Sequence, residues 1–227
     1  MKDMAVCQMG LENPQWINKW SQKKYPRLYP DFCVHGFGTD GEPGTSYWMA
    51  TLLDPMGEYF REGVTILDYG CGCARLFNFI TGYLKDFKYY GAEPEGGQEI
   101  EKAELYFKDD PRAFFMTCEE AIKSKEAMSC DVVILGSIFT HLLEGKCEAI
   151  LESLWPIIDN GGMIIFTAIF KQEAQAIKPG AHGFKDCYGV SYQRIGWIED
   201  LEQKFSCEII CVNKFQTGVL QNIFRIQ

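Results

Sequence analysis

Long apolar runs and a basic charge balance are both missing from this 227-residue sequence. No stretch approaches the roughly 20 apolar residues that a membrane-spanning helix needs, and no apolar segment follows residues 1–4 as it would in a secretory signal. The formal net charge is -9, which disfavours a nucleic-acid backbone or an anionic membrane surface as the main partner, since both are bound through basic patches. We therefore expect a cytoplasmic protein with no nucleic-acid and no membrane partner.

Cysteine pairs with metal-binding spacing are also lacking, although the chain has 10 cysteines. Cys71 and Cys73 lie inside a glycine-rich turn, and Cys207 and Cys211 lie in an apolar segment without a second pair or a histidine cluster. Structural zinc sites need four ligands brought together by such pairs. We predict no metal site and expect buried, reduced thiols.

The most informative stretch that is present runs over residues 64–76, VTILDYGCGCARL. Val64, Ile66 and Leu67 form a short apolar run with β-branched residues, which predicts a strand, and a helical pattern opens at Ala74. Between them lies a glycine turn that contains Gly70 and Gly72. A strand that passes through such a turn into a helix presents backbone N–H groups at the carboxyl edge of a sheet. The stretch therefore predicts a site for the anionic end of a nucleotide-like ligand.

The spacing in this turn separates two cofactor classes. A dinucleotide fingerprint, Gly-x-Gly-x-x-Gly/Ala, has a small residue where this chain has Arg75, so a nicotinamide-dependent oxidoreductase is disfavoured. The stretch instead resembles motif I of the class I S-adenosylmethionine-dependent methyltransferases, often written D-x-G-C-G-x-G-R. Ala74 replaces the third glycine of that motif, which matters only if this residue takes a positive φ.

The resemblance implies an α/β fold: a doubly wound, Rossmann-like sheet of seven strands, mostly parallel with an antiparallel C-terminal pair. It covers the chain from about residue 62, which suggests an N-terminal helical or loop extension or lid over 1–62 and a cofactor-binding domain over 63–227. A carboxylate at the tip of strand two, here Glu93, accepts hydrogen bonds from the ribose hydroxyls of an adenosine cofactor. The residues expected to bind S-adenosylmethionine are Asp68, Gly70, Cys71, Gly72, Glu93, Cys118, Glu119, Gly136 and Ser137.

The rest of the chain alternates between apolar strand patterns and helical patterns, as a doubly wound sheet requires. A glycine- and proline-containing segment at 171–190 interrupts this alternation and is expected to be a loop. We predict strands over 88–94, 111–118, 131–135, 163–169, 208–212 and 219–226, and helices over about 74–86, 96–107, 147–158 and 195–205.

Methyl transfer depends more on positioning, which contributes about 7 to 11 kcal/mol, than on a general base, which adds roughly a factor of 100 to 10,000 in rate. His141 follows the fourth predicted strand and is the candidate catalytic base for a small-molecule acceptor, with His182 and His35 as rivals. The aromatic pair Tyr47 and Trp48 is either core cover or a wall for the cationic cofactor. A non-catalytic adaptor with the same fold stays open, as does the oligomeric state.

Overall fold

The computed structural model describes residues 52–95, 98–124, 128–172, 175–179, 188–217 and 219–226. The predictions for Tyr47 and Trp48, and for the rival bases His35 and His182, concern residues outside these ranges. The elements are η1 (Asp54–Tyr59), β1 (Val64–Tyr69), α3 (Arg75–Thr81), β2 (Phe87–Glu93), α4 (Gln98–Phe107), β3 (Ala113–Thr117), α5 (Cys118–Lys123), β4 (Cys130–Leu135), α6 (Glu144–Leu154), η3 (Trp155–Ile157), β5 (Ile158–Ala168), β6 (Phe170–Lys171), β7 (Gln175–Pro179), β8 (Tyr188–Arg194), α7 (Trp197–Phe205), β9 (Ile209–Thr217) and β10 (Val219–Ile226).

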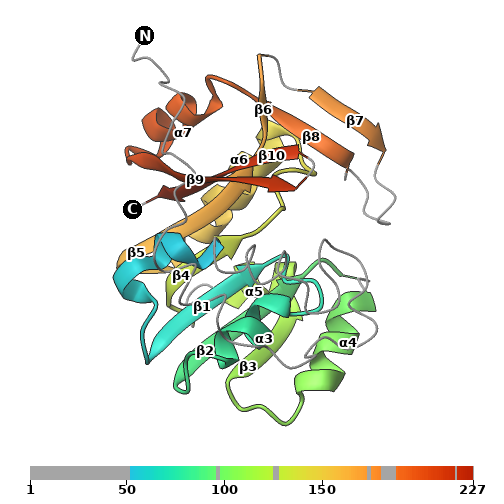
Figure 1. Cartoon of the computed structure of the whole chain (residues 1–227), viewed down its shortest axis with the longest axis vertical. Coiled ribbons are helices and arrows are strands. Elements are labelled where there is room, and N and C mark those ends of the chain that lie inside the picture. The colour runs from blue at the N-terminus through green and yellow to red at the C-terminus, as the bar shows by residue number, and fades with distance from the viewer. Residues whose placement is uncertain are drawn as a thin grey trace.

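Seven strands form the main sheet in the order β3-β2-β1-β4-β5-β10-β9 (Figure 1). Neighbouring strands from β3 to β5 are parallel, whereas β10 is antiparallel to both β5 and β9. This is the predicted doubly wound, Rossmann-like sheet with an antiparallel C-terminal pair. The strand order reverses between β1 and β4, and ligands of such sheets bind outside the carboxyl ends of the strands at that reversal.

Two apolar layers cover the sheet, because alternate residues of each strand face opposite sides. On one face Ile66 of β1 and Ile134 of β4 pack with α3 and with Leu52, Leu53 and Met56. On the other face the neighbouring residues of the same strands pack with α5, α6 and α7, around the fully buried Trp197. Burial on both faces explains the continuous apolar runs of these strands.

The N-terminal boundary remains a prediction, since the described part of the proposed extension 1–62 is limited to residues 52–62. Leu52, Leu53 and Met56 in that part are buried in the same cluster as β1. They therefore contribute to the core of the sheet domain.

The prediction of a loop over residues 171–190 is wrong for its described parts. β6, β7 and β8 form a second, three-stranded sheet in the order β6-β8-β7, at the upper right of Figure 1. Pro179 ends β7, which is an edge strand of this small sheet, and proline is tolerated there because its missing N–H is not needed for pairing. The proline and glycine residues of this segment therefore did not exclude strands.

Several further boundaries differ from the sequence prediction. The helix expected over 147–158 is α6, which ends at Leu154, and the strand expected over 163–169 is β5, which begins at Ile158. The helix expected over about 74–86 ends at Thr81, with Gly82 as its C-cap. The strand expected over 111–118 ends at Thr117, whose side chain caps the short helix α5 in a capping box with Glu120. The threonine and glutamate three residues apart are the sequence signal of that helix start.

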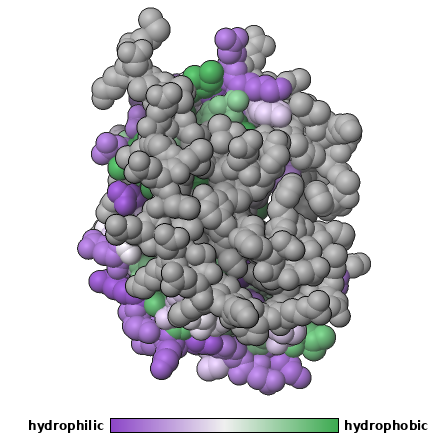
Figure 2. Space-filling model, viewed as in Figure 1, coloured by the Kyte–Doolittle hydropathy of each residue, from purple (hydrophilic) through white to green (hydrophobic). Residues whose placement is uncertain are grey.

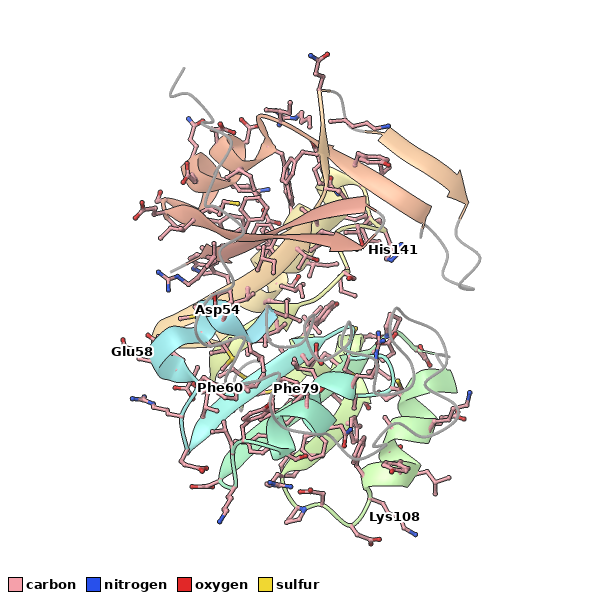
Figure 3. All side chains as sticks on the ribbon, in the orientation of Figure 1. Asp54, Glu58, Phe60, Phe79, Lys108 and His141 are labelled. Atoms are coloured by element: carbon pink, nitrogen blue, oxygen red, sulfur yellow. The ribbon has the colours of Figure 1, made fainter. Side chains whose placement is uncertain are left out.

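Exposed large apolar side chains of the described chain include Leu105 and Tyr106 of α4. Figure 2 shows hydrophilic side chains gathered along the lower rim of the view, the end of the molecule where Figure 3 places Lys108. Across the described ranges, every helix falls short of the length and apolarity that a membrane crossing requires.

Candidate functional site

The turn after β1 is built from residues in left-handed backbone conformations. Gly70 has φ 84°, Gly72 has φ 53° and Ala74, the N-cap of α3, has φ 58° and ψ 39°. The alanine in place of the third motif glycine matters only if its φ is positive, and the φ of Ala74 is positive. A left-handed residue with a Cβ costs roughly 1–2 kcal/mol, so this turn has the glycine geometry of the motif but carries strain at its third position.

Gly70 and Gly72, the first two glycines of the turn, differ in what a side chain would meet there. A Cβ at Gly70 would lie 2.0 Å from Cδ1 of Ile138, which follows β4, so this glycine brings the β1 and β4 turns into contact. A Cβ at Gly72 would meet no atom within 4 Å of the described structure. Among the described residues, space is therefore left beside the backbone at Gly72.

Glu93 connects the tips of β1 and β2. Its Oε2 accepts a hydrogen bond of 2.8 Å from the Gly72 N–H, and the residue is 9% exposed. The bond fixes the carboxylate beside the glycine turn. A carboxylate has about four lone-pair sites, so an oxygen that accepts from Gly72 retains acceptor capacity for a ligand hydroxyl. The structure thus brings together two of the predicted cofactor-binding residues through a direct contact.

Asp68, the acidic residue of the motif, is buried behind the turn. Its Oδ2 accepts a hydrogen bond of 2.6 Å from the Tyr89 hydroxyl. Burial raises the pKa of Asp68 to about 6, while the Tyr89 hydrogen bond and the charge of Arg75 both lower it. Sequence reasoning missed Tyr89, which reads as an ordinary β2 core residue. Its hydroxyl has a partner only because β1 and β2 lie side by side in register.

Cys118 of α5 also reaches the β1 turn. Burial raises the pKa of the Cys118 thiol to about 12, although hydrogen bonds with Tyr69 and the Gly70 backbone lower it. Burial likewise raises the pKa of Cys71 well above its usual value. Both thiols are free and protonated at neutral pH, which argues for packing and against a nucleophilic role. Cys73 is disulfide-bonded, so the expectation of reduced thiols is wrong at this residue.

Glu119 lies apart from this cluster. Its side chain is 67% exposed and forms an ion pair of 2.7 Å with Lys123, one turn further along α5. The structure therefore places Cys118 at the β1 turn and directs the neighbouring carboxylate to solvent.

The turn after β4 completes the arrangement. Ser137 is a non-glycine residue with φ 62°, and its N–H donates a hydrogen bond of 2.8 Å to the buried Thr167 hydroxyl of β5. The Thr140 hydroxyl donates to the Ser137 carbonyl over 2.7 Å. The sequence signal for Thr167 was a polar residue inside an apolar strand, and sequence reasoning did not use it.

Gly136 and His141 occupy the two ends of this β4 turn. A Cβ at Gly136 would lie 3.0 Å from Leu52, so the segment before β1 packs closely against the turn. Figure 3 shows His141 on the right of the molecule, the side toward which β1 points in Figure 1, and Glu58 on the opposite side. Among the described residues, no group of three or more His, Cys, Asp or Glu is placed to hold a metal ion.

No protein-family model matches the sequence, and no curated protein matches it. Solved structures match its fold. Magnesium protoporphyrin IX methyltransferase (ChlM) from Synechocystis PCC 6803, with bound S-adenosylhomocysteine (SAH), superposes with a TM-score of 0.58 at 15% identity, covering 94% of each chain. A SAM-dependent methyltransferase from Leishmania major gives a TM-score of 0.62 at 12% identity, covering 94% of this chain and 82% of that one.

The N-terminal domain of EvdMO1, solved with SAH bound, gives a TM-score of 0.60 at 11% identity and covers 93% of this chain and 94% of that chain. Structural likeness at such low sequence identity establishes the fold and leaves the methyl acceptor open. The strand order, the strand-reversal site and these likenesses agree. The chain has the fold of the class I S-adenosylmethionine-dependent methyltransferases.

Proposed function

We propose that this chain is a methyltransferase that transfers the methyl group of S-adenosylmethionine to an oxygen or nitrogen of a small-molecule acceptor. The observation that carries the proposal is the hydrogen bond of 2.8 Å between the Gly72 N–H and the Glu93 carboxylate. A carboxylate beside a left-handed glycine turn suits the hydroxyls of a ribose, and no described residue fills the space next to Gly72, which supports the proposal.

The residues present fit the two ends of this cofactor. Glu93 would accept hydrogen bonds from the ribose. Within the β1 turn the Gly70 and Cys71 N–H groups donate to the Ala92 carbonyl and the Ala74 N–H donates to the Cys71 carbonyl, so these bonds fix the shape of the turn beside Glu93. Gly136 and Ser137, in contact with the β1 turn through Ile138, would border the methionine portion. Cys118 would border the adenine. Glu119 would contribute its backbone only, because its side chain is paired with Lys123.

When bound, S-adenosylmethionine would supply a methyl group made electrophilic by a cationic sulfur. The protein would then lower the barrier mainly by positioning, because holding two reactants in line contributes about 7 to 11 kcal/mol. The rigid turns after β1 and β4 serve this purpose. His141 would take a proton from a hydroxyl or amine acceptor, a step worth roughly 100- to 10,000-fold in rate.

A non-catalytic, cofactor-binding adaptor is the second candidate. The left-handed Ala74 favours it, because strain at the third motif position departs from the pattern of the enzymes that the sequence resembles. The two candidates share the cofactor site and differ in turnover.

Calorimetric titration tests the cofactor directly. The purified chain, stripped of carried-over ligand, is titrated with S-adenosylmethionine, SAH and NADH in parallel. We expect binding of the two sulfur nucleotides and none of NADH. Glu93→Ala should weaken SAH binding by about 10- to 100-fold, the effect of losing hydrogen bonds to a charged group. Glu152→Gln is the matched control, because Glu152 of α6 is an exposed carboxylate paired with Lys204 of α7.

Absence of binding by folded wild-type protein would overturn the proposal. Binding without methyl transfer across a broad panel of alcohols, phenols, amines and carboxylic acids would favour the adaptor. Methyl transfer that survives His141→Gln at saturating acceptor would remove His141 as the base.

A further inference from the structure

The turn between β4 and α6 is held by the small sheet through its backbone carbonyls. The Gln193 side-chain amide of β8 donates hydrogen bonds to the Phe139 carbonyl over 2.6 Å and to the Leu142 carbonyl over 2.9 Å. The Ser191 N–H, on the same face of β8, donates to the Thr140 carbonyl over 2.7 Å. Three carbonyls on both sides of His141 therefore have their donors on β8.

β8 is itself fixed at this position. The Gln193 N–H donates to the Ile169 carbonyl over 2.7 Å, and Arg194 binds Glu144 of α6 through its N–H over 2.6 Å and through Nε over 3.0 Å. Gln193 is fully buried. These contacts hold Gln193 and its neighbour Arg194 to β5's exit and to the start of α6.

The burial of Gln193 is costly for stability alone. Its Oε1 has no hydrogen-bond partner among the described residues, and an unsatisfied buried polar atom costs about 1–3 kcal/mol. The orientation of the amide is set by the two carbonyls, because only the NH₂ group can donate to them. A side chain that leaves its oxygen unpaired in order to hold two carbonyls fits a role in fixing the shape of the turn.

The same turn carries Ser137, with its positive φ, and His141. We propose that Gln193 is a positioning residue: it holds the turn after β4 so that Ser137 and His141 keep their places at the methyl-donor site. This inference rests on the proposed function. A displacement of about 1 Å at a reacting site can cost about 100-fold, so a buried residue that never touches the ligands can affect both binding and transfer.

Gln193→Met tests the proposal by keeping the length of the side chain and removing both donors. Gln193→Glu is the second variant, because it keeps the shape and loses both donors when ionised. Glu148→Gln is the matched control: Glu148 binds Trp197 over 3.2 Å and Lys204 over 2.8 Å, so it destabilises the α6–α7 contact without touching the turn.

Two readouts separate positioning from stability. The first is SAH affinity by calorimetry, compared at equal loss of melting temperature. The second is the NMR chemical shift of the His141 imidazole at a fixed pH, which is tractable because the chain has 3 histidines and His141→Gln assigns the signal.

We expect Gln193→Met to weaken SAH binding at least about tenfold and to change the chemical shift of the His141 imidazole, while Glu148→Gln leaves both unchanged. Gln193→Glu should recover affinity as the pH falls, since a protonated carboxyl donates one hydrogen bond. If the wild type binds SAH and both Gln193 variants match the control in affinity and chemical shift, the inference fails alone. If the wild type binds neither S-adenosylmethionine nor SAH, the proposed function fails and the inference with it.

Discussion

Replacement of Asp68 by asparagine should stabilise this protein at neutral pH and abolish one component of its pH dependence. Asp68 is 5% exposed, and burial raises its pKa from 3.8 to about 6. A difference of about two pKa units corresponds to about 3 kcal/mol of destabilisation of the ionised folded state. An asparagine oxygen can still accept the hydrogen bond from Tyr89, so the substitution removes the buried charge and keeps the contact.

The sign follows from proton binding. Between about pH 4 and pH 6 folded Asp68 holds a proton that the unfolded chain has released, so the free energy of unfolding falls as the pH rises, by up to about 1.4 kcal/mol per unit. Above pH 6 this contribution is constant. Asp68→Asn lacks it, so its stability relative to the wild type should grow by about 2–3 kcal/mol from pH 4 to pH 7.

Urea unfolding of both proteins at several values between pH 4 and pH 7.5 measures this difference, and subtraction cancels the other carboxylates. Tyr89→Phe is the companion variant. It removes a hydrogen bond that lowers the pKa of Asp68, so it should move the pH-dependent window upward. A wild-type-minus-variant difference that stays constant with pH, or one that favours the wild type increasingly as pH rises, would refute the assignment of a raised pKa.

Three further pairs of substitutions test the turns around the site. Ala74→Gly should change stability by no more than about 1 kcal/mol, because relief of left-handed strain is offset by backbone entropy and a lost buried methyl, whereas Ala74→Val should cost several kcal/mol by urea unfolding. Gly70→Ala should destabilise the fold more than Gly72→Ala, since only the first Cβ meets atoms of the β4 turn, while Gly72→Ala should reduce SAH affinity in calorimetry. Thr167→Val should lower the free energy of unfolding by about 1–3 kcal/mol and speed hydrogen exchange at the Ser137 amide, because it removes the acceptor of that amide. Thr167→Ser is the control that keeps the acceptor. Unchanged exchange in Thr167→Val would exclude this hydrogen bond.

The sequence predicted the main sheet because the responsible signals are local. Strands such as β4 are continuous apolar runs, and the glycine turn after β1 has a recognisable spacing. The small sheet was missed because the described part of its edge strand β7 lacks a long apolar run and ends at Pro179. Its strands are stabilised by pairing partners that are not adjacent in the chain.

The candidate site also contains residues that local sequence signals predicted and residues that they did not. Gly70, Gly72 and Glu93 were predicted, and the structure joins Gly72 to Glu93 by a hydrogen bond. The supporting contacts of Tyr89 and Gln193 were not predicted, because each depends on which strand lies opposite. Pairing of β1 with β2 brings Tyr89 to Asp68, and the return of β8 brings Gln193 to the β4 turn.

The distribution of energetic cost within the fold supports the placement of the site. Among the described residues, the non-glycine residues with positive φ are Ala74, Ser137 and Ser206. Ser206 is the C-cap of α7, where a left-handed residue is ordinary. The other two flank the point where the strand order reverses, and Asp68, whose charge is unfavourably buried, lies just before the first of them. A left-handed residue with a Cβ persists only where the surrounding structure holds it, so Ala74 and Ser137 at the carboxyl ends of β1 and β4 support a functional constraint at this edge of the sheet.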